Sequence, residues 1–284
     1  MKKHSVVALL AAATLSCSGR APTPSAAAVQ DETGRFVWQD LVTDDVDGSR
    51  SFYSQLLGWS YEERTRLGKP YVLVKTRDGQ IVAGMTSVER DDPDQPIAQW
   101  VSYVQVENVD SAAEAVRAAG GDVLVAPLAL DGVGRAALVT DSQGAPLGLV
   151  SFTIQIPADA GLPDVGHFFW RDYLATEVQE ALAFYESFPG YAADTESVGG
   201  VTHRVFRRGP NGLAEGGLVP VGEAPVRPSW LPYVRVEDPE ALARRVPSLG
   251  GEVLLAPSAD VRNGTFAIVA DPSGAAIALQ KWPM

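Results

Sequence analysis

The chain has 284 residues, 46% of them hydrophobic and 20% charged, which is ordinary for a soluble globular protein and enough for two medium-sized domains. Its formal net charge is -12, from 35 acidic and 23 basic residues, and such an acidic surface argues against nucleic acid as a partner. After the N-terminus, no apolar run approaches the length that spans a bilayer.

The N-terminus has the pattern of an export signal. A positive start is followed by a short apolar run over residues 5–15, which predicts a signal peptide over residues 1–16. The run ends in a small residue before Cys17, as in a bacterial lipoprotein signal, although Thr14 stands where leucine is usual. We therefore expect residues 17–33 to hold a lipidated Cys17 and a flexible tether, with the lipid as the only membrane contact. The exported protein would then be anchored to the bacterial envelope; the alternative is a secreted or periplasmic soluble protein.

The rest of the chain consists of two copies of one sequence repeat. The matching pairs are Phe36–Leu41 with Phe168–Tyr173, Phe52-Tyr53 with Phe184-Tyr185, Gly84 with Gly216, Trp100 with Trp230, and Asp141 with Asp271. The spacing is about 132 positions up to Gly84 and shrinks by about two after it, which one short loop deletion explains. The repeat predicts one domain over residues 34–153 and a second over residues 165–284, joined by a linker over residues 154–164.

Each copy shows the same order of elements. The first copy predicts a strand over residues 36–43, a helix over 46–57, strands near 60–64, 71–75 and 81–88, a strand over 101–106, a helix over 111–119, and strands near 122–126, 136–140 and 146–154. Asp45 is suited to begin the first helix and Gly58 to end it. The order is βαβββ twice in each copy, which indicates an α+β fold.

These patterns resemble the vicinal oxygen chelate superfamily, which includes glyoxalases, bleomycin-resistance proteins and extradiol dioxygenases. The residues that carry the resemblance are Asp45, Phe52-Tyr53, Leu57-Gly58-Trp59, Tyr103–Asp110, Gly120-Gly121, Asp141–Gly144 and their counterparts Tyr233–Asp238, Gly250-Gly251 and Asp271–Gly274. The resemblance implies two βαβββ modules per domain, whose sheets curl into a cleft. It also implies a monomer, since tandem domains can mimic the family dimer. Enzymes of the family hold one divalent metal in the cleft, and binding members sequester a ligand there without metal.

The resemblance also places the metal-ligand positions. They fall at Trp38, Gly84, Trp100 and Gly148 in the first copy and at Trp170, Gly216, Trp230 and Ala278 in the second. None of these side chains can give a lone pair to a metal, so we expect no metal and no cofactor. Glu215 is adjacent to one position, but only a β-bulge would turn it into the cleft.

The same positions suggest an aromatic-walled pocket. We expect the ligand-binding residues to be Trp38, Asp40, Tyr71 and Trp100 in the first copy and Trp170, Asp172, His203 and Trp230 in the second. Each aspartate stands two residues after a tryptophan, so on a strand the carboxylate lies beside the indole. The alternatives are tryptophans that fill the vacated cleft, aspartates paired with the backbone or with an arginine such as Arg64, and a structural His203.

Three functions are consistent with these patterns. The first is a metal-independent envelope protein that binds a small organic ligand, aromatic or cationic. The second is a metal-free lyase or isomerase with Asp40, Asp172 or His203 as general base. The third is a structural or partner-binding module. The sequence assigns no catalytic residue.

Overall fold

The computed structural model describes residues 32–89, 98–130, 132–153, 161–198, 201–209, 212–222 and 226–283. The predicted signal peptide, Cys17 and nearly all of the tether lie outside the described residues, as does most of the linker. Within the described ranges, no helix combines the length and the apolar composition needed to cross a bilayer.

The first copy folds into one curled sheet of eight strands with two helices. Its elements are β1 (Phe36–Thr43), α1 (Val46–Leu57), β2 (Ser60–Arg66), β3 (Lys69–Lys75), β4 (Ile81–Ser87), β5 (Gln99–Gln105), α2 (Val109–Ala118), β6 (Asp122–Leu130), β7 (Gly134–Thr140) and β8 (Pro146–Phe152). The strand order is β2-β3-β4-β1-β5-β8-β7-β6. The two modules therefore meet where β1 pairs antiparallel with β5.

The second copy repeats this topology. Its elements are β9 (Phe168–Ala175), α3 (Val178–Ser187), β10 (Tyr191–Val198), β11 (Val201–Arg208), β12 (Ala214–Pro220), β13 (Ser229–Arg235), α4 (Pro239–Arg245), β14 (Glu252–Leu255), β15 (Phe266–Ala270) and β16 (Ala276–Gln280), with short 3₁₀ turns at Val246–Leu249 and Arg262–Gly264. The order β10-β11-β12-β9-β13-β16-β15-β14 matches that of the first sheet. The predicted α+β fold of two tandem curled sheets is confirmed.

Local signals set the helix ends as the sequence indicates. The carboxylate of Asp45 accepts a hydrogen bond from the Gly48 backbone N–H at 2.8 Å and begins α1. Gly58 ends the helix in the left-handed conformation, with φ of 75°, which a glycine adopts without strain.

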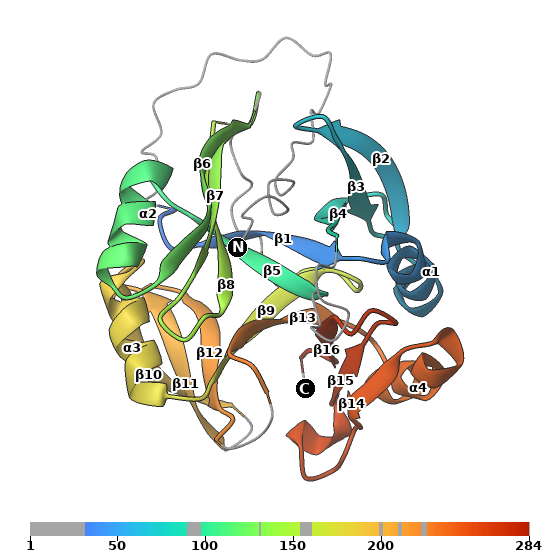
Figure 1. Cartoon of the computed structure of the whole chain (residues 1–284). Helices are drawn as coiled ribbons and strands as arrows, with labels where there is room; N and C mark the ends of the chain where they lie inside the picture. The colour runs from blue at the N-terminus through green and yellow to red at the C-terminus, as the bar shows by residue number, and fades with distance from the viewer. Residues whose placement is uncertain are drawn as a thin grey trace, which may run out of the picture.

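The two sheets lie back to back, and their concave faces point in opposite directions (Figure 1). The helices lie in two pairs at opposite sides of the molecule, and each pair packs with strand residues in a core that crosses from one copy to the other (Figure 1). In one core α2 packs with α3, and in the other α1 packs with α4 and the 3₁₀ turn that follows it (Figure 1). Modules thus pair by strand hydrogen bonds within a copy and by apolar packing across copies.

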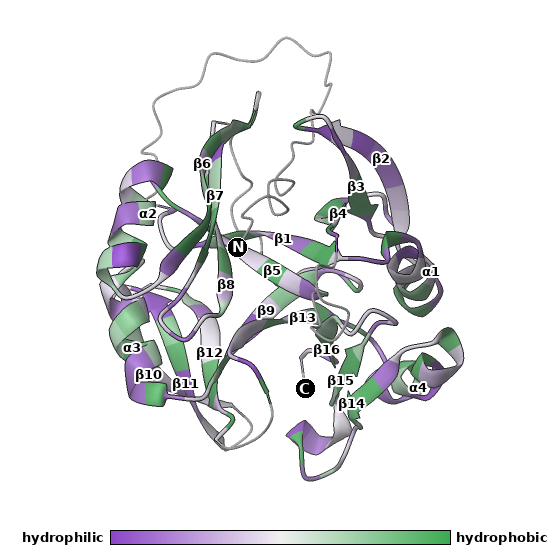
Figure 2. Ribbon diagram, in the orientation of Figure 1, coloured by the Kyte–Doolittle hydropathy of each residue, from purple (hydrophilic) through white to green (hydrophobic). Residues whose placement is uncertain are grey.

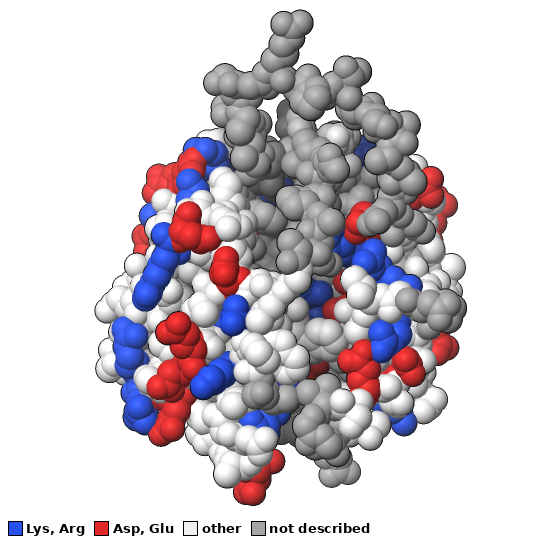
Figure 3. Space-filling view, turned by 180° about the vertical axis from the view of Figure 1, so that it is seen from behind, with Lys and Arg blue, Asp and Glu red and all other residues white. Residues whose placement is uncertain are grey.

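The colouring by hydropathy fits this arrangement. The helices alternate between hydrophobic and hydrophilic residues along their length, as expected when one face packs on a core and the other meets water (Figure 2). On the face drawn in Figure 3, basic and acidic side chains are interspersed over the described surface, so the net negative charge is not gathered in one patch there.

Two buried aspartates join the copies through the turns before β8 and β16. Asp141 accepts hydrogen bonds from the backbone N–H groups of Gln143 and Ala145 and from the hydroxyl of Tyr185 in the other copy, at 2.9 Å. Asp271 accepts a bond from the Ser49 hydroxyl, at 2.6 Å. These aspartates, which the repeat singled out, therefore position the interface between the copies.

Burial raises the pKa of both Asp141 and Asp271 above the ordinary 3.8, against the hydrogen bonds that lower it. A raised pKa means that the folded state binds more protons than the unfolded state above pH 3.8, so stability from these groups falls as pH rises through that window. We expect Asp141→Asn, which keeps an acceptor for the two backbone N–H groups, to lose less stability on going from about pH 4 to about pH 7 than the parent chain does.

Thermal unfolding of the full chain across this pH range tests the expectation. Asp110→Asn is the matched control, because hydrogen bonds from Arg135 lower the pKa of that exposed carboxylate. Its stability contribution is present above the unfolded pKa and is lost as pH falls, so the control must move in the opposite direction. Parallel pH profiles for the two variants would contradict the assignment.

Candidate functional site

A β-bulge at the start of each first strand decides which aromatic side chains face the clefts. On β1, Phe36 pairs with Val104 and Trp38 pairs with Tyr103, so Val37 is the extra residue. Phe36 therefore packs in the core between the copies, whereas Trp38 lies on the concave face. The same shift on β9 makes Phe169 the extra residue beside Trp170.

Four positions form the floor of each cleft, because strand pairing sets them side by side. In the first copy they are Asp40 opposite Gly84 and Tyr103 opposite Gly148. In the second copy they are Asp172 opposite Gly217 and Tyr233 opposite Ala278. The first-copy position Gly84 thus corresponds to Gly217, which corrects the assignment of Gly216 made from unbroken sequence spacing.

The correction has a physical cause in a second bulge, on β12. Phe206 pairs with Gly216, but Arg207 pairs with Ala214, so Glu215 is the extra residue. A Cβ on Gly216 would meet the Trp230 ring at 2.7 Å, whereas one on Gly217 would collide with the carboxylate of Asp172. The glycine that faces the cleft is therefore one position later than the repeat indicates.

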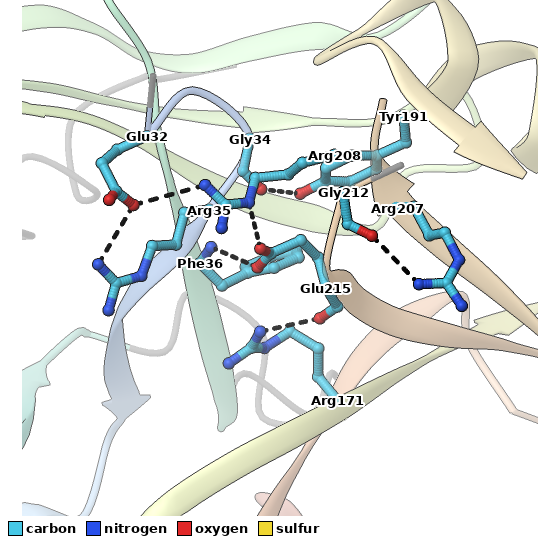
Figure 4. A network of polar contacts seen from close by, with 10 residues as sticks. All are labelled: Glu32, Gly34, Arg35, Phe36, Arg171, Tyr191, Arg207, Arg208, Gly212 and Glu215. Atoms are coloured by element: carbon cyan, nitrogen blue, oxygen red, sulfur yellow. Dashed lines mark hydrogen bonds and ion pairs between the residues drawn. The ribbon is translucent and has the colours of Figure 1, made fainter. Parts of the chain in front are cut away.

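The bulge does not bring Glu215 into the cleft. Its carboxylate pairs with Arg208 at 2.6 Å and accepts the Phe36 backbone N–H at 3.2 Å (Figure 4). Glu32 contacts both Arg208 and Arg35 in the same network (Figure 4). Glu215 therefore ties the start of β1 to the second sheet, and it is not a cleft ligand.

The carboxylate at the floor of the second cleft is buried and held by three donors. Asp172 is 3% exposed. Its Oδ1 accepts a bond from Trp170 Nε1 at 2.8 Å, and its Oδ2 accepts one from the Tyr233 hydroxyl at 2.5 Å. An Nη2 group of Arg262 lies 3.4 Å from the same Oδ2. The expected contact between indole and carboxylate is present, but the carboxylate has little capacity left for a cationic ligand.

A cavity of about 710 Å³ opens on the concave face of the second sheet. Trp170, Asp172 and His203, three of the expected ligand-binding residues, line it. Phe169, Tyr233 and Trp282 form an aromatic wall, in which the Phe169 ring centroid is 6.3 Å from that of Tyr233 and 6.4 Å from that of Trp282. Its volume lies in the range of about 300–1,000 Å³ that is usual for small-molecule sites.

The first cleft holds a different arrangement around the same kind of carboxylate. Asp40 Oδ1 accepts bonds from Trp38 Nε1 at 2.9 Å and from the Tyr71 hydroxyl at 2.6 Å. The Arg66 guanidinium lies over the Tyr71 ring and 4.0 Å from the other carboxylate oxygen. Burial raises the pKa of Asp40, and the charge of Arg66 and the two hydrogen bonds oppose that rise. The partner of this aspartate is therefore Arg66 rather than Arg64.

Trp100 and Trp230 do not share the clefts with the other tryptophans. Trp100 pairs with Leu41 on the convex face of its sheet, and Trp230 pairs with Tyr173. Both are buried in the cores between the copies, where each donates its indole N–H to a helix tyrosine. The spacing from the aromatic residue three positions later predicts a metal-ligand position for Trp100 and Trp230. The strand register places Tyr103 and Tyr233 at that position instead.

Sequence reasoning missed several residues of the second cleft, namely Phe169, Glu196, Arg262, Gln280 and Trp282. Phe169 reaches the cavity because of a bulge, which leaves no signal in a single sequence. For Arg262 the sequence does hold a signal: the repeat aligns this arginine with a glycine of the first copy, Gly132.

Two tandem sheets, each built from two βαβββ modules around a cleft, define the glyoxalase-like fold. The model of the Glyoxalase/Bleomycin resistance protein/Dioxygenase superfamily matches residues 35–147. The chain is 30% identical over 246 residues to the protein named "Putative glyoxylase CFP32" of Mycobacterium tuberculosis, covering 86% of this chain and 93% of that protein. The chain belongs to this superfamily.

A second relative and two solved structures extend the comparison. The protein named "Anthracycline biosynthesis protein DnrV" of Streptomyces peucetius is 30% identical over 254 residues, which cover 85% of this chain and 91% of that protein. The Mn(II)-bound glyoxalase from Novosphingobium aromaticivorans has a TM-score of 0.58 at 16% identity and covers 88% of this chain and 82% of its own. The 2,2',3-trihydroxybiphenyl 1,2-dioxygenase from Sphingomonas wittichii has a TM-score of 0.54 at 13% identity, and the match covers 88% of this chain and 90% of that protein. At these identities the two structures support the fold alone.

The divalent metal that the family implies does not fit the residues at either cleft floor. In the second copy Asp172 is the one carboxylate among the four floor positions, and its oxygens already accept bonds from Trp170 and Tyr233. A divalent ion needs several carboxylate, imidazole or thiolate ligands. Throughout the described ranges, no three such side chains come together in a way that could hold an ion.

Proposed function

We propose that this chain is a metal-independent small-molecule-binding protein of the bacterial envelope, and that an aromatic compound binds in its second cleft. The observation that carries the proposal is the cavity of about 710 Å³, which is lined by Trp170 and by the aromatic wall of Phe169, Tyr233 and Trp282. Aromatic rings supply a large apolar area and favour stacked or edge-on ligand rings. The cationic alternative has less support, because three donors already engage Asp172.

The name of one relative supports an aromatic ligand. An anthracycline is a fused-ring aromatic compound, and DnrV is named for the biosynthesis of such compounds. The envelope part of the proposal rests on the predicted signal peptide and on Cys17, and fractionation of cells that express the full chain tests it.

Two other functions have weaker support. A metal-free lyase or isomerase needs an acid–base group in the cavity, and His203 is the candidate, since Asp172 is engaged and Glu196 pairs with Arg207. A partner-binding module would favour one continuous apolar surface. The exposed large apolar side chains of the described residues are instead spread along the chain. Two lie in the strands β6 and β14 and the others in connecting segments: Leu124, Leu254, Leu67, Leu162, Val165, Leu213 and Val226.

The proposal predicts saturable binding of a neutral fused-ring probe such as 2-naphthamide, in buffer that contains a chelator. We expect the probe to quench tryptophan fluorescence and to raise the melting temperature of the full chain. Trp170→Ala should weaken binding by about tenfold, ~1.4 kcal/mol, because it removes the ring beside Asp172. Trp38→Ala, the same change in the first copy, should have little effect. If neither 2-naphthamide nor an anthracycline aglycone binds, or if only Trp38→Ala weakens binding, the proposed site is wrong.

A further inference from the structure

The turn before β15 places a charged side chain in the second cleft by means of an unfavourable backbone conformation. Arg262 and Asn263 have φ of 49° and 54°, in the left-handed region that side chains other than glycine rarely adopt. Hydrogen bonds hold the turn, including those from the Gly264 N–H to the Ser258 carbonyl at 2.8 Å and from the Thr265 hydroxyl to the Arg262 carbonyl at 2.5 Å. The strain is therefore built into the fold.

Comparison of the two copies shows what the strained residue adds. Phe266 pairs with Gln280 as Ala136 pairs with Val150, so the two copies differ by about 130 positions in this region. By that offset Arg262 corresponds to Gly132, which has φ of 75°. A glycine adopts a positive φ without strain, whereas the Arg262 side chain makes the same kind of conformation unfavourable in the second copy. That side chain lines the cavity.

Two aromatic rings pack against the planar guanidinium of Arg262, and some of its N–H donors remain unused. It lies over the rings of Tyr233, at 5.2 Å, and Phe266, at 4.8 Å. It donates to Gln280 Oε1 at 2.8 Å and, at the longer distance of 3.4 Å, to Asp172 Oδ2. It also has a side-chain hydrogen bond with Tyr233. A guanidinium carries five N–H donors, so these contacts leave donors that no other described residue takes up. Stacking and a planar fork of donors are the features that suit arginine to a carboxylate or another oxyanion.

None of the other charged residues along the cavity matches Arg262 as a binding group for a charged ligand. Asp172 is buried and engaged, and Glu196 pairs with Arg207. Asp260 is exposed at the rim. Arg204 alternates with His203 along β11, so its side chain points away from the concave face. Arg262 is thus the cavity cation that is both oriented by neighbours and supplied with unused donors.

We propose that the second cleft selects a planar aromatic ligand that carries an anionic oxygen, and that Arg262 binds this oxygen while the rings of the ligand contact Trp170 and Tyr233. The inference rests on the proposed function and names the class of ligand for that site. Of the aromatic or cationic ligand expected from the sequence, it keeps the aromatic part and replaces the cationic one, because Arg262 itself contacts Asp172, the carboxylate that would receive a cation.

Calorimetric titration of the full chain with two probes of the same shape tests the inference. We expect 2-naphthoate, an anion, to bind at least about tenfold more tightly than neutral 2-naphthamide, at low salt and with a chelator present. Arg262→Gly restores the residue that the first copy has at this turn. It should bring the ratio of the two affinities to about one, with no fall in melting temperature, because it removes the backbone strain together with the charge.

The outcomes separate this inference from the proposed function. If 2-naphthamide binds the parent chain and 2-naphthoate binds no better, or if Arg262→Gly keeps the preference for the anion, the anionic ligand is wrong and the aromatic site stands. Tighter binding of 2-naphthylmethylammonium than of 2-naphthoate would also overturn it. If naphthoate, naphthamide and the anthracycline aglycone all fail to bind, the proposed function itself fails, and this inference fails with it.

Discussion

Trp230→Ala is expected to destabilise the full chain by about 3–5 kcal/mol, a large share of the stability of an ordinary domain. The side chain is 2% exposed and lies in the core between the copies. Its ring packs against Phe36 at 4.9 Å, Tyr185 at 5.2 Å and Tyr173 at 5.3 Å between centroids. The substitution removes these contacts, leaves a cavity, and leaves the Tyr185 hydroxyl without the indole donor at 2.8 Å.

Urea unfolding of the parent chain and of two alanine variants measures the effect. Trp170→Ala is the matched control, since it removes the same side chain from a half-buried position on the concave face of the same sheet. We expect the loss at Trp170 to be the smaller one by at least about 2 kcal/mol. A larger loss at Trp170 than at Trp230 would mean that the strand register described above is wrong. Trp230→Phe should fall between the parent and the alanine variant, because it keeps part of the packing and loses the hydrogen bond.

The contrast between these two tryptophans shows how far the sequence could be followed. The α1 bounds and the caps at Asp45 and Gly58 are local signals, and the structure confirms them. The repeat predicts that the two copies share one topology, and both sheets have the same strand order. In a regular strand the alternation of residues also predicts which face a side chain lies on. Trp170 therefore lies beside Asp172, two residues later, as expected. That inference stops at a bulge, because one extra residue exchanges the two faces of a strand.

Two errors have this origin or a related one, and one kind of contact could not be predicted at all. Glu215 is the extra residue on β12, so Gly217 and not Gly216 faces the cleft. The spacing from an aromatic neighbour predicts a cleft position for Trp230, but the pairing of β13 with β9 decides its face and places it in the core. Contacts between the copies, such as that of Asp141 with Tyr185, depend on packing across more than 40 residues of chain, and no local pattern predicts them.

The exchange of a tyrosine for a histidine explains why the second cleft has open space at its floor. Tyr71 and His203 hold the same register position, opposite Arg64 on β2 and opposite Glu196 on β10. In the first copy the Tyr71 hydroxyl lies over Gly84, where it would collide with any Cβ at that position. Over Gly217 the nearest atoms belong to Asp172 and to the Arg204 backbone, and His203 does not reach that space.

We therefore expect His203→Tyr to close the second cleft. The new hydroxyl should lie over Gly217 and donate to Asp172 Oδ1, as Tyr71 donates to Asp40 at 2.6 Å. Binding of 2-naphthamide should weaken by at least about tenfold, ~1.4 kcal/mol, because the ring takes up part of the cavity. The melting temperature should not fall, because the added ring has a hydrogen-bond acceptor and an apolar wall to pack against.

Fluorescence titration together with thermal unfolding separates closure of the cleft from damage to the fold. Thr202→Tyr is the matched control: it adds the same ring one residue earlier on β11, where alternation along the strand turns the side chain away from the concave face. This control should keep the parent affinity. Unchanged binding in His203→Tyr would show that the ligand does not use the space over Gly217. An equal loss in both variants would trace the effect to the strand rather than to the cavity.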